Sequence, residues 1–247
     1  MNISGSRVLL PGASGAIGSA LAVRLHRGGA RLALAGHDAE RLRRVSEACA
    51  GAPVFRFDAY DLDRCARAPG WAAGELGGLD AVVVCVGVAG FGPADTVPDA
   101  VAEHLFTVNA LAPLAFLRAA LPRVSPSGVL AAVTGVVVDA PPAGMADYAA
   151  AKSALAAWLT AVRRERRRTG TAVLDIRLPH VESGFAARRV VGEPPRLPRG
   201  LTVDEAADRV VAELIGRKAE HTGREAELTG REAEFTGREA QPTGRGA

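Results

Sequence analysis

The sequence has 247 residues, of which 48% are hydrophobic and 23% are charged, and its formal net charge is +3. This composition is typical of a globular chain with one domain and a full hydrophobic core, and it excludes a fibrous or wholly disordered protein. The small net charge gives no support to a nucleic-acid-binding protein.

Two further features concern location and partners. Cys49, Cys65 and Cys85 stand far apart without a CxxC pair, so the sequence predicts neither a disulfide framework nor a metal site. The N-terminus lacks the basic segment and apolar core of a signal peptide, and no apolar run is long enough for a membrane span. We therefore expect a cytoplasmic protein that binds a small-molecule substrate and neither nucleic acid nor membrane.

Short apolar runs alternate along the chain with segments of helical period. The first half reads RVLL, a helix over Ala16 to Arg27, RLALA, a helix over Ala39 to Ala48, VFRF, a helical region and DAVVVCV. The second half reads a helix over Phe106 to Leu121, GVLAAV, a helix from about Asp147 to Arg168, AVLDIRL and a helix near Asp204 to Ile215. This alternation predicts a single-domain α/β protein with a doubly wound parallel-sheet Rossmann fold, helices covering both faces.

The basic run at residues 163–168 coincides with the predicted end of a helix. Cations at a helix C-terminus complement the helix dipole, which explains this run better than a nucleic-acid patch does.

The character of the chain changes at Gly216, where the repeat GRKAEHT, GREAELT, GREAEFT, GREAQPT begins. Each copy contains Gly and Thr, and the repeat has too few apolar residues for a core or for a coiled-coil seam. We therefore predict a catalytic domain over residues 1–215 and a disordered low-complexity tail over residues 216–247. The alternative is that one copy, around residues 225–228, adds an edge strand.

A glycine-rich turn, PGASGAIG, follows the first predicted strand and opens the first helix. Glycines at this place let the chain turn tightly and bring backbone N–H groups and the positive helix end against a pyrophosphate. The alternative is that the glycines only allow close packing of helix on strand. We expect the cofactor to contact Gly12, Ser14, Gly15, Ala16, Ile17 and Gly18.

The residues after the second strand bear on the choice between NAD and NADP. An acidic residue there would hydrogen-bond the ribose 2′-hydroxyl of NAD and repel a 2′-phosphate. The slot holds Gly36, and His37 is a candidate phosphate partner, which favours NADP; Asp38 favours NAD. His37 is alternatively a solvated turn residue.

Tyr148 and Lys152 lie four residues apart in DYAAAK, near the start of a predicted helix. This spacing places both side chains on one face. A nearby ammonium favours the phenolate and lowers the pKa of a tyrosine, which suits it to proton transfer. The alternative is an ordinary surface pair.

The ordered motifs PGASGAIG, FDAYD, DAVVVCVG, VNA, YAAAK and LPHVESGF resemble the short-chain dehydrogenase/reductase family over residues 6 to 215. The resemblance implies hydride transfer between a nicotinamide and a carbonyl or alcohol carbon. It makes Tyr148 the acid/base, Lys152 its tuning cation and a ribose contact, and Asn109 part of a proton relay. It also implies cofactor contacts by Asp58, Ala59, Val86, Gly87, Pro179, Val181 and Ser183.

Three positions depart from the family pattern. The usual NNAG reads Val84 to Gly87, and the usual PG pair reads Pro179 and His180, which makes His180 a substrate contact, a spare acid or a solvent-facing residue. The serine expected thirteen residues before the tyrosine is Gly135, preceded by Thr134. That serine normally hydrogen-bonds the substrate oxygen, and Thr134 could replace it only after a one-residue shift.

Two functions remain open from the sequence. The first is an NADP(H)-dependent ketoreductase or alcohol dehydrogenase of specialised metabolism, a homodimer or homotetramer, with Thr134, Gly135 and His180 at the substrate and the segment from Phe185 to Leu201 as a lid. The second is a redox-silent family member: a non-redox isomerase or cyclase using Tyr148, or a nucleotide-binding regulatory module. The missing serine favours the second function, and the retained Tyr148, Lys152 and Asn109 favour the first.

Overall fold

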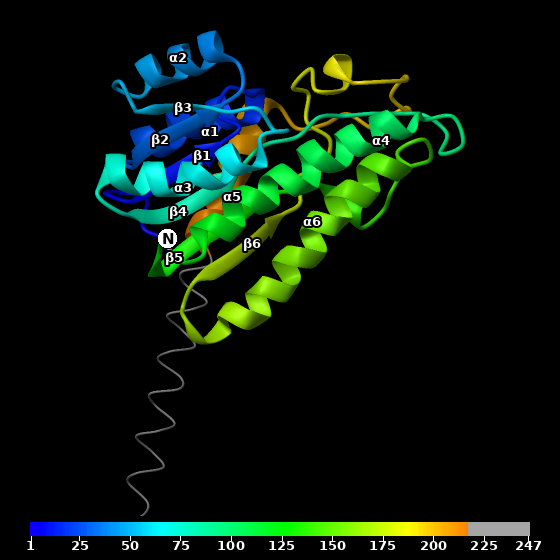
Figure 1. Ribbon diagram of the computed structural model, residues 1–247. Helices are drawn as coiled ribbons and strands as arrows, with labels where there is room; N and C mark the ends of the chain where they lie inside the picture. The colour runs from blue at the N-terminus through cyan, green and yellow to red at the C-terminus, as the bar shows by residue number, and fades with distance from the viewer. Residues whose placement is uncertain (217–247) are drawn as a thin grey trace, which may run out of the picture.

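The structure, a computed structural model, describes residues 1–216 of the chain (Figure 1). Within them six parallel strands form a sheet in the order β3-β2-β1-β4-β5-β6. The strands are β1 (Arg7–Pro11), β2 (Arg31–Gly36), β3 (Val54–Arg56), β4 (Leu79–Val84), β5 (Val124–Val133) and β6 (Ala172–Ile176). The predicted doubly wound parallel Rossmann sheet is confirmed, and each predicted apolar run forms a strand.

Helices cover both faces of this sheet, as expected for strands buried on two sides. One face carries α1 (Ala16–Arg27), α2 (Ala39–Ala48) and the helix formed by residues 203–216. The other carries α3 (Leu62–Leu76), α5 (Ala112–Ala120) and α6 (Ala146–Glu165), which lie side by side in Figure 1. The chain order reverses between β1 and β4, and ligands of open α/β sheets bind beyond the carboxyl ends of the strands at such a point.

The helix predicted from Phe106 begins earlier than expected. It runs without a break from α4 (Asp99–Phe106) through one turn of π-helix, η1 (Thr107–Leu111), into α5. The whole helix, Asp99–Ala120, has 22 residues and is long and apolar enough to cross a membrane, which corrects the expectation that no segment is. It packs against α3 and α6, and core helices of water-soluble proteins pass the same test of length and composition.

The ends of other elements follow from local chemistry. Asp38 and Asp61 cap α2 and α3 by accepting the backbone N–H groups of Arg41 and Arg64. The basic run begins in the last turn of α6 and continues through η3 (Arg166–Arg168), which confirms its interpretation as a helix end. Gly216, the first residue of the predicted tail, still belongs to the helix of residues 203–216. The rest of the predicted tail, residues 217–247, lies outside the described residues and stays a prediction.

Candidate active site

A cavity of about 600 Å³ opens at the carboxyl ends of the central strands, beside the reversal between β1 and β4. Segments distant in sequence meet there: the turn into α1, the loop after β4, the end of β5, the start of α6 and the chain after β6. The predicted site residues that line it are Gly15, Ala16, Ile17, Gly18, Val86, Gly87, Thr134, Gly135, Tyr148, Lys152, Pro179, His180, Val181 and Ser183. Gly12, Ser14, His37, Asp58, Ala59 and Asn109 are not among the residues that line it.

The glycine turn brings two backbone segments into direct contact. Gly12 has a φ of +93°, and a Cβ atom there would lie 2.6 Å from the carbonyl of Cys85. A Cβ on Gly18 would lie 2.2 Å from the carbonyl oxygen of Gly12. Gly15 is the N-cap of α1 and provides no side-chain hydrogen bond, so the first N–H groups of the helix remain for an anionic ligand. The turn therefore fits the pyrophosphate of a dinucleotide.

At the end of β2, any side chain would require its neighbours to shift. A Cβ on Gly36 would lie 2.7 Å from Oγ of Ser14. The carboxylate of Asp38 accepts the backbone N–H of Arg41 at 3.0 Å, so the acid that favoured NAD is committed to capping α2. Arg41 itself lines the cavity. Sequence analysis missed Arg41, although a cation in the first turn after His37 was a visible signal.

Tyr148 and Lys152 project from one face of α6 into the cavity, as the spacing predicts. The Lys152 ammonium donates to the carbonyl oxygens of Val133 at 3.2 Å and Val86 at 3.4 Å. Burial lowers the pKa of Lys152 to about 8 and raises the pKa of Tyr148 above its usual value. Within residues 1–216 no side chain lowers the pKa of Tyr148, so the lowering expected from Lys152 is absent from this geometry.

Asn109 acts on the loop after β4 rather than on the cavity. Its Oδ1 accepts the N–H of Val88 at 3.1 Å, and its Nδ2 donates to the carbonyl oxygens of Val88 at 3.0 Å and Leu105 at 2.9 Å. A Cβ on Gly87 would lie 2.9 Å from Oδ1 of Asn109 and 3.0 Å from Nζ of Lys152. The absence of a side chain at Gly87 therefore lets Asn109 and Lys152 approach the same backbone.

The position of the missing serine has a conformation that favours glycine. Gly135 has φ +108° and ψ 158°, a region that side-chain-bearing residues rarely adopt. Thr134 next to it is buried, and its hydroxyl donates to the carboxylate of Asp175. Because a hydroxyl has one proton to donate, this hydrogen bond commits the donor of Thr134 to Asp175, and its predicted contact with substrate stays a prediction.

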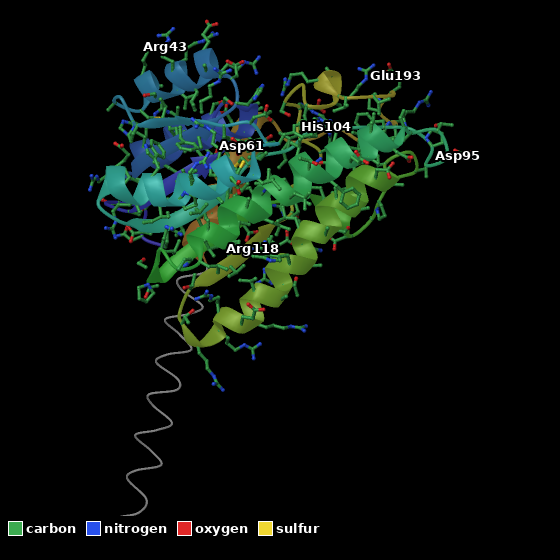
Figure 2. The ribbon with its side chains drawn as sticks, viewed as in Figure 1. Arg43, Asp61, Asp95, His104, Arg118 and Glu193 are labelled. Carbon is green, nitrogen blue, oxygen red and sulfur yellow. The ribbon has the colours of Figure 1, made fainter. Side chains whose placement is uncertain are left out.

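The lid predicted over Phe185 to Leu201 corresponds to a segment that we define as the lid, residues 182–200. Its base is closed by the bridge between Val181 and Leu201. Its middle is held by backbone hydrogen bonds from Val190 to Ala89 at 2.8 Å and from Phe91 to Val191 at 3.0 Å. Figure 2 places Glu193 of the lid at the periphery of the molecule.

Beneath the lid the cavity is apolar. Its wall is formed by Ala89, Phe91, Val137 and Met145, which belong with Ala149 to a small hydrophobic cluster against which Phe185 packs. The ring centroids of Phe185 and Tyr148 lie 6.2 Å apart. Sequence analysis did not single out Phe91 or Met145, because an isolated apolar residue in a loop carries no signal of its own.

His180 stands at the junction of cavity and lid. Its Nε2 lies 3.4 Å from Oε1 of Glu182, and its side chain is 23% exposed. A Cβ on Gly200 would lie 2.7 Å from the imidazole Cδ2, so the ring packs directly on the lid backbone. This placement joins two of the alternatives left open for His180: the residue lines the cavity and also reaches solvent.

Known proteins resemble this chain in sequence and in fold. The chain matches the family described as short chain dehydrogenase over residues 6–192. A hydroxysteroid 11-beta-dehydrogenase 1-like protein from Macaca fascicularis is 34% identical over 172 residues, which cover 66% of this chain and 59% of that protein. The chain thus spans about three fifths of the length of this curated relative. An uncharacterized oxidoreductase from Myxococcus xanthus is 30% identical over 72% of this chain and 73% of its own length.

Solved structures share the fold. A short chain dehydrogenase from Burkholderia cenocepacia in complex with NADP superposes with a TM-score of 0.78 at 24% identity, covering 87% of this chain and 92% of that chain. A short-chain dehydrogenase/reductase from Serratia marcescens gives a TM-score of 0.77 at 22% identity with the same coverage.

Proposed function

The chain belongs to the short-chain dehydrogenase family, a family of NAD(P)-dependent oxidoreductases, and on that premise we propose that it is an NADP(H)-dependent ketoreductase or alcohol dehydrogenase. Family membership confirms the resemblance that the sequence motifs carry. The observation that supports the proposal most is that Tyr148 and Lys152 line the same cavity as the glycine turn. A proton donor, a cation and a cradle for a dinucleotide thus share one site.

The proposed chemistry divides between the cofactor and the chain. A bound nicotinamide supplies or accepts hydride at the carbonyl or alcohol carbon. In reduction, Tyr148 donates its hydroxyl proton to the oxygen of the substrate; in oxidation, the phenolate takes that proton back. Lys152, with a pKa of about 8, carries a positive charge at neutral pH. Although it does not lower the pKa of Tyr148 in the geometry without ligands, it is the cation on the same helix face that we expect to stabilise the phenolate that remains after donation.

Three features of the ribose end support NADP over NAD. The slot at Gly36 holds no acid and lies against Ser14, Asp38 is used as a helix cap, and Arg41 lines the cavity. An arginine recognises a phosphate by charge and by paired N–H donors. We expect calorimetric titration to show tighter binding of NADPH than of NADH; tighter binding of NADH would overturn this choice.

The cavity wall supports an uncharged, apolar carbonyl substrate. The cluster under the lid offers aliphatic and aromatic side chains, and Tyr148 is the group placed to donate to a reacting oxygen. A carboxylate packed against this cluster would lose hydration there, and its possible partners, Arg188 and His180, lie elsewhere on the cavity lining. Among ketones of one carbon skeleton, we expect the neutral compound to be reduced faster than its carboxylate analogue.

The experiment on Tyr148 has a matched control in the chain, because the sequence contains two tyrosines. Tyr148→Phe removes only the hydroxyl, so we expect turnover of NADPH with a carbonyl panel to fall by at least about 10²-fold while NADPH binding is retained. Tyr60→Phe removes the hydroxyl of an exposed tyrosine, 61% exposed, and should leave turnover unchanged. Equal turnover of Tyr148→Phe and wild type would reject the proposal.

A second function has one specific observation in its favour. Gly135 provides no hydroxyl, and that of Thr134 is bound to Asp175, so the usual second donor to the substrate oxygen is missing. A redox-silent isomerase or cyclase would still use Tyr148 as acid/base. Transformation of a substrate without oxidation of NADPH, abolished by Tyr148→Phe, would select this function. The cytoplasmic location, the role in specialised metabolism and the homodimer or homotetramer stay predictions.

A further inference from the structure

A buried carboxylate that the proposed chemistry does not use lies beneath α6. Asp175 stands in β6, and its side chain is 5% exposed. Strand alternation defines the face it occupies: Leu174 and Ile176 pack into the core under α1, whereas Val173 packs into the core under α6. Asp175 shares the face of Val173, which is the face from which Lys152 approaches the sheet.

The strand register brings Asp175 to the end of β5. Ala132 of β5 pairs with Asp175, so Thr134 and Asp175 project on the same side of neighbouring strands. The Thr134 hydroxyl donates to Oδ1 of Asp175, and Lys152 donates to the carbonyl of Val133, the residue before Thr134. The carboxylate and the ammonium therefore brace adjacent residues of one strand end.

The remaining partners of Asp175 lead toward the surface. The guanidinium of Arg177 donates from Nε to Oδ2 of Asp175 at 2.9 Å. A second guanidinium nitrogen of Arg177 bonds the exposed Asp139. Arg177 thus gives the buried carboxylate of Asp175 a cationic partner.

We propose that Asp175 is a positioning residue for Lys152, its buried carboxylate supplying the negative charge that keeps the ammonium protonated beneath α6. The proposal rests on the proposed function for its consequence, because only a protonated Lys152 stabilises a Tyr148 phenolate. The geometry itself requires no substrate or cofactor.

The polar groups around Lys152 come from the end of β4, from β5, from β6 and from α6 itself. Cys85 directly follows β4, Asp175 lies in β6 on the face covered by α6, and Tyr148 lies one turn before Lys152 on α6. β5 and the loop after β4 contribute the backbone carbonyls of Val133 and Val86. Burial lowers the pKa of Lys152, and the charges of Cys85 and Asp175 oppose that lowering. Because burial also raises the pKa of Cys85 to about 12, its thiol is neutral at physiological pH. Asp175, which is paired with Arg177 on its outer side, is the remaining acidic side chain among them.

Lysine-specific NMR can test this directly, because the sequence contains two lysines, Lys152 and Lys218. Full-length protein labelled with ¹³C and ¹⁵N in lysine gives two side-chain signals, assigned by the substitution Lys218→Arg. A titration from about pH 6 to pH 10 measures the midpoint of Lys152. Asp175→Asn keeps the size of the side chain and removes its charge, so we expect the midpoint to fall by at least about 0.5 pH unit. Asp175→Ser is a second charge-removing variant if asparagine is not tolerated.

Two matched controls separate this role from a structural one. Asp139→Asn removes a negative charge from the exposed side of Arg177, and Thr134→Val removes the hydroxyl that contacts Asp175. Neither should move the Lys152 midpoint as far as Asp175→Asn does. An unchanged midpoint in Asp175→Asn with a lower melting temperature would show a structural brace only and overturn the proposal. An equal shift in Asp139→Asn would overturn it as well, since the effect would then be general charge.

The titration also separates this proposal from the proposed function. Failure of the protein to reduce any carbonyl would leave the Lys152 midpoints as measured. Conversely, a protein that reduces ketones with an unmoved midpoint in Asp175→Asn would retain its function and lose this positioning residue.

Discussion

The two halves of the cavity use glycine for different physical reasons. In the cofactor half, a Cβ on Gly18 would lie 2.2 Å from the carbonyl oxygen of Gly12, so backbone contact leaves no space for any side chain. In the substrate half, a Cβ on Gly135 would find its nearest neighbour at 3.5 Å, so there is space, but φ is +108°. In the cofactor half, close approach of backbone segments requires glycine, and the family motif is kept. In the substrate half, a torsion angle favours glycine, and a family side chain has been lost.

The largest effect is expected in the cofactor half. Gly18→Ala forces a methyl group onto backbone atoms that cannot rotate away, so we expect about 2–3 kcal/mol of destabilisation and at least tenfold weaker NADPH binding. Urea unfolding and fluorescence titration measure the two quantities. Gly74→Ala is the control, because its Cβ would meet nothing within 4 Å in α3 and should stabilise the helix slightly. Normal stability of Gly18→Ala would remove the contrast between the halves.

The carboxylate of Asp80 links the strands beneath the two halves of the cavity, and its removal tests whether the domain unfolds as one unit. Asp80, at the amino end of β4, accepts hydrogen bonds from Arg7 of β1 at 2.8 Å and Ser125 of β5 at 3.1 Å. The Arg7 guanidinium lowers the pKa of Asp80 from 3.8 to about 2. A lowered pKa stabilises the fold at pH values above about 4, and this stabilisation is lost as the pH falls toward 2.

Asp80→Asn should therefore cost about 1–2 kcal/mol at neutral pH and almost nothing near pH 2. Thermal unfolding at both pH values, followed in the near and far ultraviolet, measures the cost and its cooperativity. Separate transitions for the two probes would show a populated intermediate and contradict unfolding of the domain as one unit.

An effect of similar size is expected in the substrate half. Gly135→Ser must place a side chain at φ +108°, which costs about 1–2 kcal/mol unless the loop moves. Gly135→Ala carries the same strain without a hydroxyl, so the ratio of the two turnover rates isolates the contribution of a restored donor. Wild-type stability in both variants would show that the torsion does not determine this position.

The smallest effect concerns the ribose end of the cofactor half. Arg41→Gln should weaken NADPH binding by about fivefold, which corresponds to about 1 kcal/mol, and leave NADH binding unchanged. Arg43→Gln is the control, because it removes a cation from the same helix. Arg43 pairs with Glu47 and lies at the outer surface in Figure 2. His37→Ala tests the remaining candidate partner. Loss of NADPH affinity in Arg43→Gln as large as in Arg41→Gln would show that general charge determines the preference.

Local patterns in the sequence determined most of the fold. RVLL and RLALA became β1 and β2, and the helix expected over Ala16 to Arg27 has those limits in the structure. Periodicity succeeds here because each element is long enough to show its buried face. The glycine turn and the Tyr148 and Lys152 pair were likewise visible, since both depend on residues close together in the chain.

Only the tertiary structure decided what depends on strand register and backbone torsion. Gly135 looked like a lost donor, and its φ shows a backbone that disfavours a serine. Thr134 looked like a substitute, and the pairing of β5 with β6 gives its hydroxyl to Asp175, 41 residues later. Asp38 looked like a candidate ribose contact, and the structure shows it capping α2 and lying 3.5 Å from Arg41, the cation that lines the cavity. The sequence reveals which groups are present, whereas the partners of a buried polar group are fixed by segments that meet only when the sheet has formed.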